Sequence, residues 1–134
     1  MKKIKIPVIW DKNYGAYTEL LPGLVVTNRD LDGLKREFQR SLQLHLADMV
    51  EDGEAVPAEF QGQYELEYHL NAQALLNYTE RIISRKALAD VTGINLQQLS
   101  HYARGWRNPR PEMQRRIVNG IHELGRQLTT ASLL

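Results

Sequence analysis

The chain has 134 residues, of which 43% are hydrophobic and 25% charged, and it contains no cysteine. This composition is ordinary for a soluble globular protein of one domain or two small ones, and the lack of cysteine excludes disulfides and cysteine-ligated zinc. No run approaches the roughly 20 apolar residues of a membrane span, and the short apolar stretch near the N-terminus is broken by Lys5 and Pro7. We therefore expect no membrane segment and no signal peptide, and a cytoplasmic location.

The net charge of +1 conceals two halves of opposite sign. Residues 1–70 carry 8 Lys and Arg against 12 Asp and Glu, whereas residues 71–134 carry 9 against 4, so the halves have charges of −4 and +5. A basic half favours a polyanionic partner such as nucleic acid, and an acidic half favours a different, basic partner. The charge pattern therefore predicts two separate tasks.

The chain opens with a pattern that predicts three short strands. Apolar residues alternate over 3–10, which predicts a first strand, and Pro7 indicates that this strand lies at an edge of its sheet. Turn-forming residues follow at 11–15, and a second strand over 16–20 is expected to form a hairpin with the first. A third strand is expected over 24–27.

A long helix and a fourth strand complete the first domain. Asp30 is expected to cap the helix, in which apolar residues recur every three or four positions from Leu31 to Met49. Gly33 costs about 1 kcal/mol relative to Ala in the first turn of a helix. Residues 51–62 predict an acidic loop, and clean alternation over 64–70 predicts the last strand. The order of elements is thus β-β-β-α-β.

The second half is predicted to be helical. A helix over 72–82 is expected to bury its apolar residues, Ile82 included, beneath the elements that follow. Residues 85–104 then predict two short helices that cross at a steep angle, because a small residue, Ala89, stands where they touch and Gly93 stands where the chain turns. This arrangement is typical of a helix-turn-helix, and Gly93 suits the left-handed conformation that ends the first helix.

The second of these helices divides into a buried side and an outward side. Leu99 and Tyr102 lie three residues apart on the buried side, which leaves polar side chains that suit base edges and phosphates on the other. The alternative is an ordinary solvated helix face. With two capping residues, the first turn and the loop after the second helix, the predicted DNA contacts are Ser84, Arg85, Lys86, Asn95, Gln97, Gln98, His101, Arg104, Arg107 and Arg110.

Residues 75–128 resemble the Xre-type, or phage-repressor-like, DNA-binding domains. The motif of that family runs L-A-x-x-x-G-[IV] and then R-G-x-x-x-P. The residues that match it here are Leu88, Ala89, Gly93, Ile94, Arg104, Gly105 and Pro109. Ala103 departs from the pattern, since the family often has Glu before R-G, and this departure affects stability more than function.

A second resemblance covers residues 2–70, which are similar to the HicB antitoxin family. The short motifs that carry it, in this order, are Gly15-Ala16-Tyr17, Leu21-Pro22-Gly23, Asp30-Leu31 at the start of the long helix, and Asp52-Gly53 followed by Pro57. The resemblance implies a β-β-β-α-β domain with a partial RNase H-like fold that neutralises a small basic ribonuclease toxin, HicA. It also implies that the tail represses the shared operon. Asn28 and Gly33 depart from the family pattern and put the start of the helix in question.

The last strand of the first domain carries polar residues on one face. Glu65, Glu67 and His69 alternate with apolar residues, and such a face is usually only solvated. With the acidic residues of 51–59 close by in sequence, however, they offer an acidic patch to a basic toxin. These three residues are the predicted toxin contacts.

The sequence predicts no enzymatic site. The candidate metal-binding carboxylates are Asp11, Glu19, Asp30 and Asp32, but turn formation, helix capping and a solvated strand face account for them, and no spacing fixes a pair. The four histidines lie in separate elements without the i, i+4 spacing of a helical metal site, and no serine stands in a nucleophile motif. We therefore expect no catalytic residue, no metal and no cofactor.

The sequence as a whole indicates an α+β protein with a toxin-binding domain over 1–70 and an Xre-type helix-turn-helix domain over 71–134. We interpret it as a bifunctional antitoxin and autorepressor whose partners are a HicA-type toxin, operator DNA with an inverted repeat, and a second copy of itself in a homodimer or a higher oligomer. The main alternative is a transcriptional regulator whose first domain senses a small ligand. A ribonuclease is a third, weaker alternative.

Overall fold

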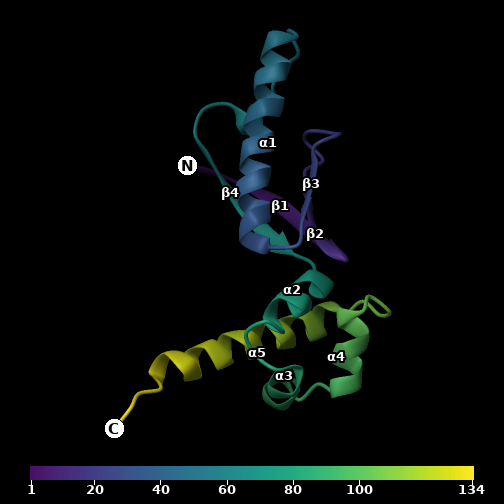
Figure 1. Ribbon diagram of the computed structural model, residues 1–134, viewed down its shortest axis with the longest axis vertical. Coiled ribbons are helices and arrows are strands. Elements are labelled where there is room, and N and C mark those ends of the chain that lie inside the picture. The colour runs from purple at the N-terminus through teal and green to yellow at the C-terminus, as the bar shows by residue number, and fades with distance from the viewer. The chain divides into compact units, whose positions relative to one another are not determined.

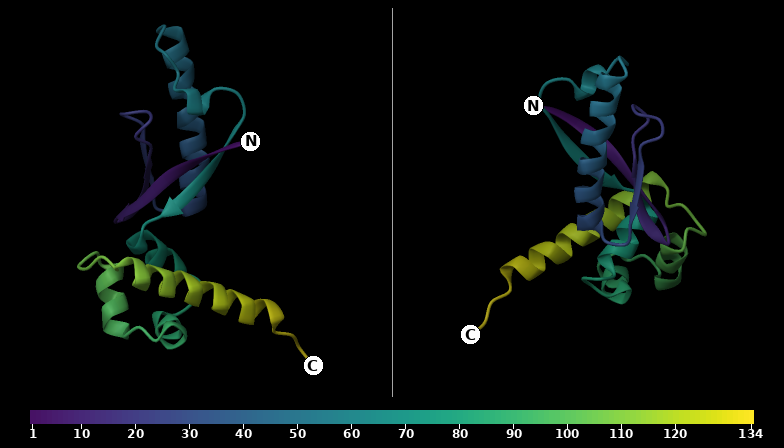
Figure 2. Two further views of the ribbon diagram at one scale, coloured as in Figure 1. Left: turned by 180° about the vertical axis from the view of Figure 1, so that it is seen from behind. Right: turned by 45° about the horizontal axis from the view of Figure 1, so that its top comes forward.

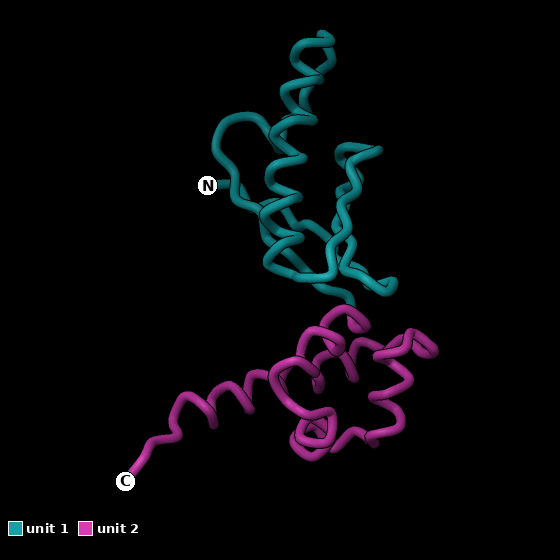
Figure 3. The backbone as a smooth tube through the Cα atoms, in the orientation of Figure 1, with its two compact units in different colours: residues 1–71 teal, residues 72–134 magenta.

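A computed structural model describes residues 1–134, and the chain divides into two compact units, Met1–Asn71 and Ala72–Leu134 (Figure 3). This division lies next to the boundary expected after Leu70. The structure is mixed α+β, with one four-stranded sheet and five α-helices. None of the helices is both long enough and apolar enough to cross a membrane.

The N-terminal unit is built on a sheet with strand order β3-β2-β1-β4 (Figure 1). The strands are β1 (Lys2–Asp11), β2 (Asn13–Tyr17), β3 (Val25–Asn28) and β4 (Tyr64–Leu70). β2 pairs antiparallel with both β1 and β3, whereas β4 pairs parallel with β1 along its whole length. The parallel pairing places the last strand of the unit beside the first.

The expectation that the first strand lies at an edge because of Pro7 was wrong, since β1 is an inner strand with β2 on one side and β4 on the other. β2 reaches only as far as Val8, however, so the first half of β1 has a strand on one side alone. The carbonyl of Val8 faces β4, where it accepts a hydrogen bond from Asn71 N at 2.9 Å. Backbone groups alternate in direction along a strand, so the N–H that Pro7 lacks would point to the side of β2. β2 has already ended there, so the missing N–H costs no hydrogen bond between strands.

The hairpin between β1 and β2 is tighter than the sequence suggested. It turns at Lys12, whose φ of 64° is left-handed, and β2 already begins at Asn13. Asp11 and residues 13–15, which were expected in the turn, therefore belong to strands, and the expected strand residues 18–20, Glu19 among them, leave the sheet. Thr18 stabilises this departure, because its Oγ1 accepts a hydrogen bond from Leu20 N at 3.2 Å.

Helix α1 (Leu31–Glu51) covers one face of the sheet (Figures 1 and 2). It buries Leu31, Leu34, Phe38 and Leu42, as the apolar spacing predicted. The strand residues that face it and form the rest of this core are Ile4, Ile6, Val8, Tyr14, Ala16 and Val26. No other element of this unit covers the opposite face of the sheet, which carries the charged residues of β1 and β4.

The start of α1 accounts for Asn28 and Gly33 together. Asp30 caps the helix as expected, since its Oδ2 accepts a hydrogen bond from Gly33 N at 2.8 Å. Asn28 Oδ1 accepts a hydrogen bond from Asp30 N at 2.8 Å, and its amide lies against Gly33, where a Cβ would stand 3.1 Å away. Asn28 and Gly33 therefore fit one another, and the helix begins where the sequence predicted.

Residues 52–63 connect α1 to β4 as the expected loop, with a 3-10 turn, η1 (Ala58–Phe60), inside it. Phe60 is buried and its ring meets that of Tyr64 edge-on, with centroids 5.4 Å apart. Lys2 Nζ donates to the carbonyls of Ala58 and Gln61 at 2.8 and 2.6 Å. The loop is thus attached to the sheet at its aromatic residue and at the N-terminal strand.

The C-terminal unit consists of α2 (Ala72–Thr79), α3 (Arg85–Thr92), α4 (Leu96–Ala103) and α5 (Pro111–Thr130). Helix α2 ends three residues earlier than the sequence suggested, and Ile82 is 65% exposed rather than packed beneath the following helices. The chain turns there because the N–H groups of Ile82 and Ile83 both donate to the carbonyl of Thr79 at 2.9 Å. The buried core comprises Leu76, Leu88, Ile94, Leu99, Tyr102, Ala103 and Ile117.

Helices α3 and α4 are separated by a short, well-capped turn. Ser84 and Asn95 cap them as expected, through Ser84 Oγ to Ala87 N at 3.0 Å and Asn95 Oδ1 to Gln97 N at 2.8 Å. Gly93 is left-handed with a φ of 72°, as predicted for the residue that ends α3. Helix α5 packs against α3, and its C-terminal turns extend beyond the other helices of the unit (Figures 1 and 2).

Candidate functional site

The outward face of α4 is the first part of the candidate site. Gln97, His101 and Arg104 stand at i, i+4 and i+7 and therefore share one side of the helix, opposite the buried Leu99 and Tyr102. Gln97 is exposed in the first turn of α4, and its side chain makes no hydrogen bond within the unit. The expected division of α4 into a buried and an outward side is confirmed.

Gln98 differs from its neighbour Gln97. It is half-buried, and its Nε2 donates a hydrogen bond of 2.7 Å to the hydroxyl of Tyr102. This bond uses one of the two N–H groups of the Gln98 amide and orients the amide toward Tyr102, while its second N–H and its Oε1 have no partner. Of the two glutamines, Gln97 is the more exposed, and its whole side-chain amide is unpaired.

The loop after α4 is held in one conformation by four backbone features. Gly105 is left-handed with a φ of 76°, and its N–H donates to Tyr102 O at 3.1 Å, while Trp106 N donates to His101 O at 2.9 Å. This pair of bonds is a Schellman motif, which ends a helix sharply. Further along, Pro109 is buried and its carbonyl accepts a hydrogen bond from Gln114 Nε2 at 3.0 Å.

The arginines of this loop point outward from a fixed backbone. Arg104, Arg107 and Arg110 are all exposed, and no carboxylate pairs with any of them. Arg110 also precedes α5 at its N-cap position, with Pro111 as the first helical residue. The loop therefore presents three guanidinium groups next to the outward face of α4.

Trp106 is a residue that the sequence reasoning missed. It is 65% exposed, the guanidinium carbon of Arg104 lies 4.9 Å from its ring centroid, and the ring of His101 lies 5.4 Å away at a tilt of 42°. An aromatic side chain between arginines in a short loop is the signal that could have indicated it. The indole joins the α4 face to the arginine loop in one polar and aromatic surface.

The three residues predicted at the start of α3 have different surroundings. Ser84 is engaged in capping, and Lys86 is exposed, with its Nζ 3.3 Å from Asp90 Oδ2. Arg85 is only 21% exposed, forms an ion pair with Glu80 and donates a hydrogen bond of 3.0 Å to Ser100 Oγ. These contacts make Arg85 a link between the start of α3 and α4.

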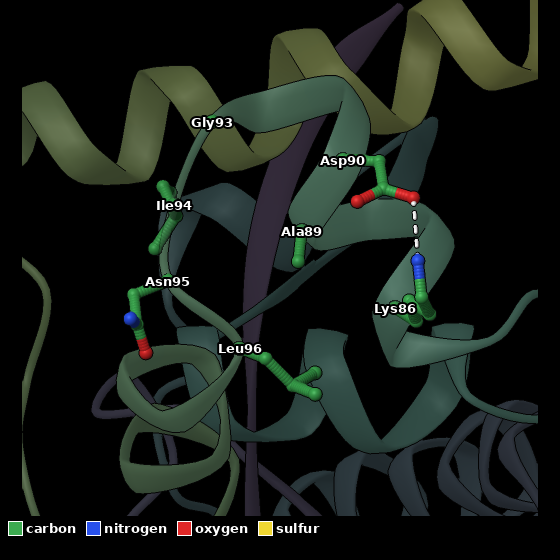
Figure 4. A pocket seen from close by; sticks show the side chains of 7 residues that line it. All are labelled: Lys86, Ala89, Asp90, Gly93, Ile94, Asn95 and Leu96. Atoms are coloured by element: carbon green, nitrogen blue, oxygen red, sulfur yellow. Dashed lines mark hydrogen bonds and ion pairs between the residues drawn. The ribbon is translucent and has the colours of Figure 1, made fainter.

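A hollow of about 560 Å³ lies where α3 turns into α4 (Figure 4). Ala89 and Leu96 form its apolar part, the Lys86 and Asp90 pair stands at one rim, and Asn95 stands near another (Figure 4). The hollow is shallow and mixed in character. Its walls are the turn itself, so the turn is open to solvent on this side.

The predicted toxin contacts lie on the open face of the sheet, but this face is not uniformly acidic. Glu65 and Glu67 stand opposite Lys3 and Lys5 on β1. Glu67 contacts Lys3 at 4.0 Å and His69 at 2.6 Å. The hydrogen bond with His69 holds the pKa of the Glu67 carboxyl below its ordinary value. Burial opposes this shift, and the electrostatic effects of His69, Lys3 and Lys5 add to it. The surface therefore has a row of lysines on β1 beside a row of carboxylates on β4.

The structure contains no group of three or more His, Cys, Asp or Glu side chains that could hold a metal ion. Among the candidate carboxylates, Asp30 caps α1 as expected. Comparisons with protein-family models, curated proteins and solved structures found no match to the chain. A functional assignment therefore rests on the geometry and charge of the two units themselves.

Proposed function

We propose that the chain is a DNA-binding regulator in which α3 and α4 act as a helix-turn-helix and α4 enters the major groove. The observation that carries the proposal is the exposed α4 face, with Gln97 in its first turn and His101 and Arg104 behind it, which continues into the arginine loop. The residues that recognition helices use for base contacts are concentrated at the N-terminal end of such helices. The charge of the C-terminal half, 9 Lys and Arg against 4 Asp and Glu, supports a polyanionic partner.

The side chains divide into three roles in this proposal. Gln97 reads base edges, because it is exposed and its amide is free. The arginines of the loop and Lys86 contact phosphates, which adds affinity without sequence preference. Arg85 positions α4 through Ser100 rather than contacting DNA, and the exposed face of Trp106 packs against the sugar–phosphate backbone.

The DNA-binding proposal predicts a salt dependence that the arginine loop controls. Each neutralised phosphate contributes about −0.9 to the slope of log affinity against log salt concentration, so replacing Arg107 and Arg110 together by Ala should reduce the slope by up to about 2. The measurement is a fluorescence anisotropy titration with duplex DNA from upstream of the chain's own reading frame, over a series of salt concentrations.

The matched control for this test lies in the N-terminal unit. Arg36 and Arg40 are exposed on α1, and replacing both by Ala removes the same charge from the chain. The control variant should bind DNA with the slope of the unmodified protein. Equal slopes for all three proteins would remove the loop from the interface, and no binding by the unmodified protein at low salt would overturn the DNA-binding proposal itself.

Within the class of DNA-binding regulators, we propose a HicB-type antitoxin that represses its own operon. The N-terminal unit has the β-β-β-α-β order that the resemblance implies for a partial RNase H-like domain, and it has a core of its own. In this reading it neutralises a HicA-type toxin, while a homodimer binds an inverted repeat in the operator. The spacing of successive major grooves, about 34 to 36 Å, is what requires two copies.

The surface that meets the toxin is proposed to include the C-terminal end of α1 and the loop after it. Glu51, Asp52, Glu54 and Glu59 are exposed there, and no cation of the unit pairs with them. Glu67, by contrast, is already paired with Lys3 and His69. A basic protein is therefore attracted more strongly by these unpaired carboxylates than by the paired Glu67 on β4.

The antitoxin proposal predicts that the two activities can be removed separately. Reversing the charges of Glu51, Asp52 and Glu54 to Lys should abolish rescue of growth when a short basic protein from the neighbouring reading frame is co-expressed. DNA binding by this variant should be unchanged. Replacing Arg107 and Arg110 by Ala should have the opposite pattern, with rescue intact. If the unmodified chain neither binds nor neutralises that neighbour, the ligand-sensing regulator becomes the better reading.

A further inference from the structure

Strand β4 leaves one of its two edges without a partner. It is the last strand in the order β3-β2-β1-β4, so β1 pairs with one edge only. Asn71 N donates to Val8 O, and Val8 stands opposite Leu70, so the odd-numbered residues of β4 direct their backbone groups toward β1. The backbone N–H and C=O groups that face the free edge are those of Tyr64, Leu66, Tyr68 and Leu70.

This free edge lacks the backbone features that prevent pairing in many proteins. Proteins blunt exposed edges with Pro, with bulges or with very short strands, and β4 is seven residues long, pairs regularly along its length and contains neither Pro nor Gly. Its side chains alternate strictly between two kinds. Those on the helix side are aromatic or aliphatic and half-buried, and those on the open side are Glu65, Glu67 and His69.

We propose that the free edge of β4 pairs antiparallel with β4 of a second copy of the chain, about a two-fold axis at Tyr68. This register sets Glu67 of each copy opposite His69 of the other, and Leu66 opposite Leu70. A carboxylate and an imidazole, which can share a hydrogen bond, and pairs of apolar side chains thus face one another across the junction. The free backbone groups of Leu66, Tyr68 and Leu70 become paired, and the two sheets join into one continuous sheet.

Two other two-fold registers of the same edge bring like charges together. An axis at Glu67 sets the two Glu67 carboxylates opposite one another. An axis at Leu66 sets Glu65 opposite Glu67 at two equivalent places. Like charges directly opposite one another destabilise a strand pair, and an axis at His69 sets imidazole against imidazole without a carboxylate partner. The charge pattern therefore favours the axis at Tyr68. A shift by one residue would expose the apolar face, because side chains alternate along a strand.

This interface lies within the N-terminal unit and does not depend on the proposed function. It involves no residue of the candidate DNA-binding surface. A chain that also pairs on DNA through its C-terminal unit would then have two self-association surfaces. Such a chain forms assemblies larger than a dimer.

The test uses cross-linking of the full chain, which has no cysteine of its own. Glu67→Cys and His69→Cys variants, each carrying a different affinity tag, are mixed and oxidised. The proposed register makes positions 67 and 69 of the two copies a non-hydrogen-bonded pair, in which side chains approach closely enough for a disulfide. We expect a covalent heterodimer in the mixture, in clear excess over the homodimer of either variant alone.

The controls use positions on the same strand and on the same face of the sheet. Glu65→Cys mixed with His69→Cys, or Glu67→Cys alone, should link efficiently only if the axis lies at Glu67, and this result would overturn the register. If every combination links equally slowly, or none links, β4 is not an interface between copies and the proposal fails.

A charge exchange tests the same pairing without cysteine. His69→Glu places carboxylates opposite one another and should weaken self-association about tenfold by sedimentation equilibrium, which corresponds to about 1.4 kcal/mol. The double exchange Glu67→His with His69→Glu restores the carboxylate–imidazole pairs across the junction and should restore the association. The same substitution also removes the contact between Glu67 and His69 within one chain. Melting curves of dilute protein, in which copies do not associate, measure the effect of that loss on the stability of the single chain. Failure of the double exchange to restore association would contradict the proposed pairing.

Discussion

Replacing Gly120 by Ala is expected to destabilise the C-terminal unit by about 1 to 3 kcal/mol, because α5 and α3 approach too closely at this residue for a side chain to fit. A Cβ at Gly120 would stand 2.4 Å from Thr92 Cγ2 and 3.2 Å from Val91 Cγ1, both on α3. Real carbon atoms do not approach to 2.4 Å, so the helices would have to separate or Thr92 would have to rotate.

Rotation of Thr92 is costly because its side chain already makes two hydrogen bonds. Its Oγ1 donates a hydrogen bond of 2.7 Å to Leu88 O and accepts one of 3.1 Å from Ile94 N. A new rotamer would break both bonds and leave the Ile94 N–H, at the turn between α3 and α4, without this partner. The substitution on α5 would therefore also weaken the turn between α3 and α4, which positions α4.

Gly125 provides the matched control on the same helix. No atom lies within 4 Å of a Cβ built there, and Ala is favoured over Gly in a helix by about 1 kcal/mol. Gly125→Ala should therefore stabilise the unit slightly, whereas Gly120→Ala should lower the midpoint of urea unfolding. Two variants with the same sign of effect would show that close approach of the helices is not what Gly120 provides.

Helix boundaries followed from the sequence where local chemistry decides them. The caps Asp30, Ser84 and Asn95 and the left-handed Gly93 all stand where they were predicted, since each depends on hydrogen bonds to residues a few positions away. The clean alternation over 64–70 likewise predicted β4 correctly. In these cases interactions between residues close together in the sequence determine the structure, so the sequence pattern alone predicts it.

Strand positions and the partners of side chains depended on contacts that no local pattern specifies. Pro7 indicated an edge, but the parallel pairing of β1 with β4 across the whole unit makes β1 an inner strand. Lys12 forms the hairpin turn although Gly15 is the better turn former by type. The position of the turn follows from the register of the hairpin, in which Asp11 of β1 pairs with Asn13 of β2.

The candidate site divides in the same way. The i, i+4, i+7 spacing of Gln97, His101 and Arg104 predicted a shared face, because helix geometry alone sets it. The same reasoning could not foresee the bond between Gln98 and Tyr102, or the ion pair of Arg85 with Glu80, which require a known rotamer or packing. Sequence spacing therefore located the surface, and the structure distinguishes its free residues from its occupied ones.

Leu99→Ala is expected to have the largest effect, a loss of about 2 to 5 kcal/mol, because it removes the side chain at the centre of the C-terminal core. Leu99 is fully buried, in one cluster with Leu76, Leu88, Tyr102 and Ile117. Since a small domain has only about 5 to 15 kcal/mol of stability in total, this loss unfolds much of the unit at moderate temperature. The N-terminal unit has its own core, so its melting transition should stay in place.

DNA binding separates this effect from a change in the reading surface. Leu99→Ala should lose affinity for operator and scrambled duplexes together, because the whole α3 and α4 arrangement depends on the core. Gln97→Ala removes only an exposed side chain, so it should stay folded, lose about 1 to 3 kcal/mol of preference for operator DNA and retain its affinity for the scrambled duplex. Equal losses on both duplexes for a folded Gln97→Ala protein would mean that another face of the unit reads the bases. A Leu99→Ala protein that melts like the unmodified chain would mean that the core does not hold α4 in position.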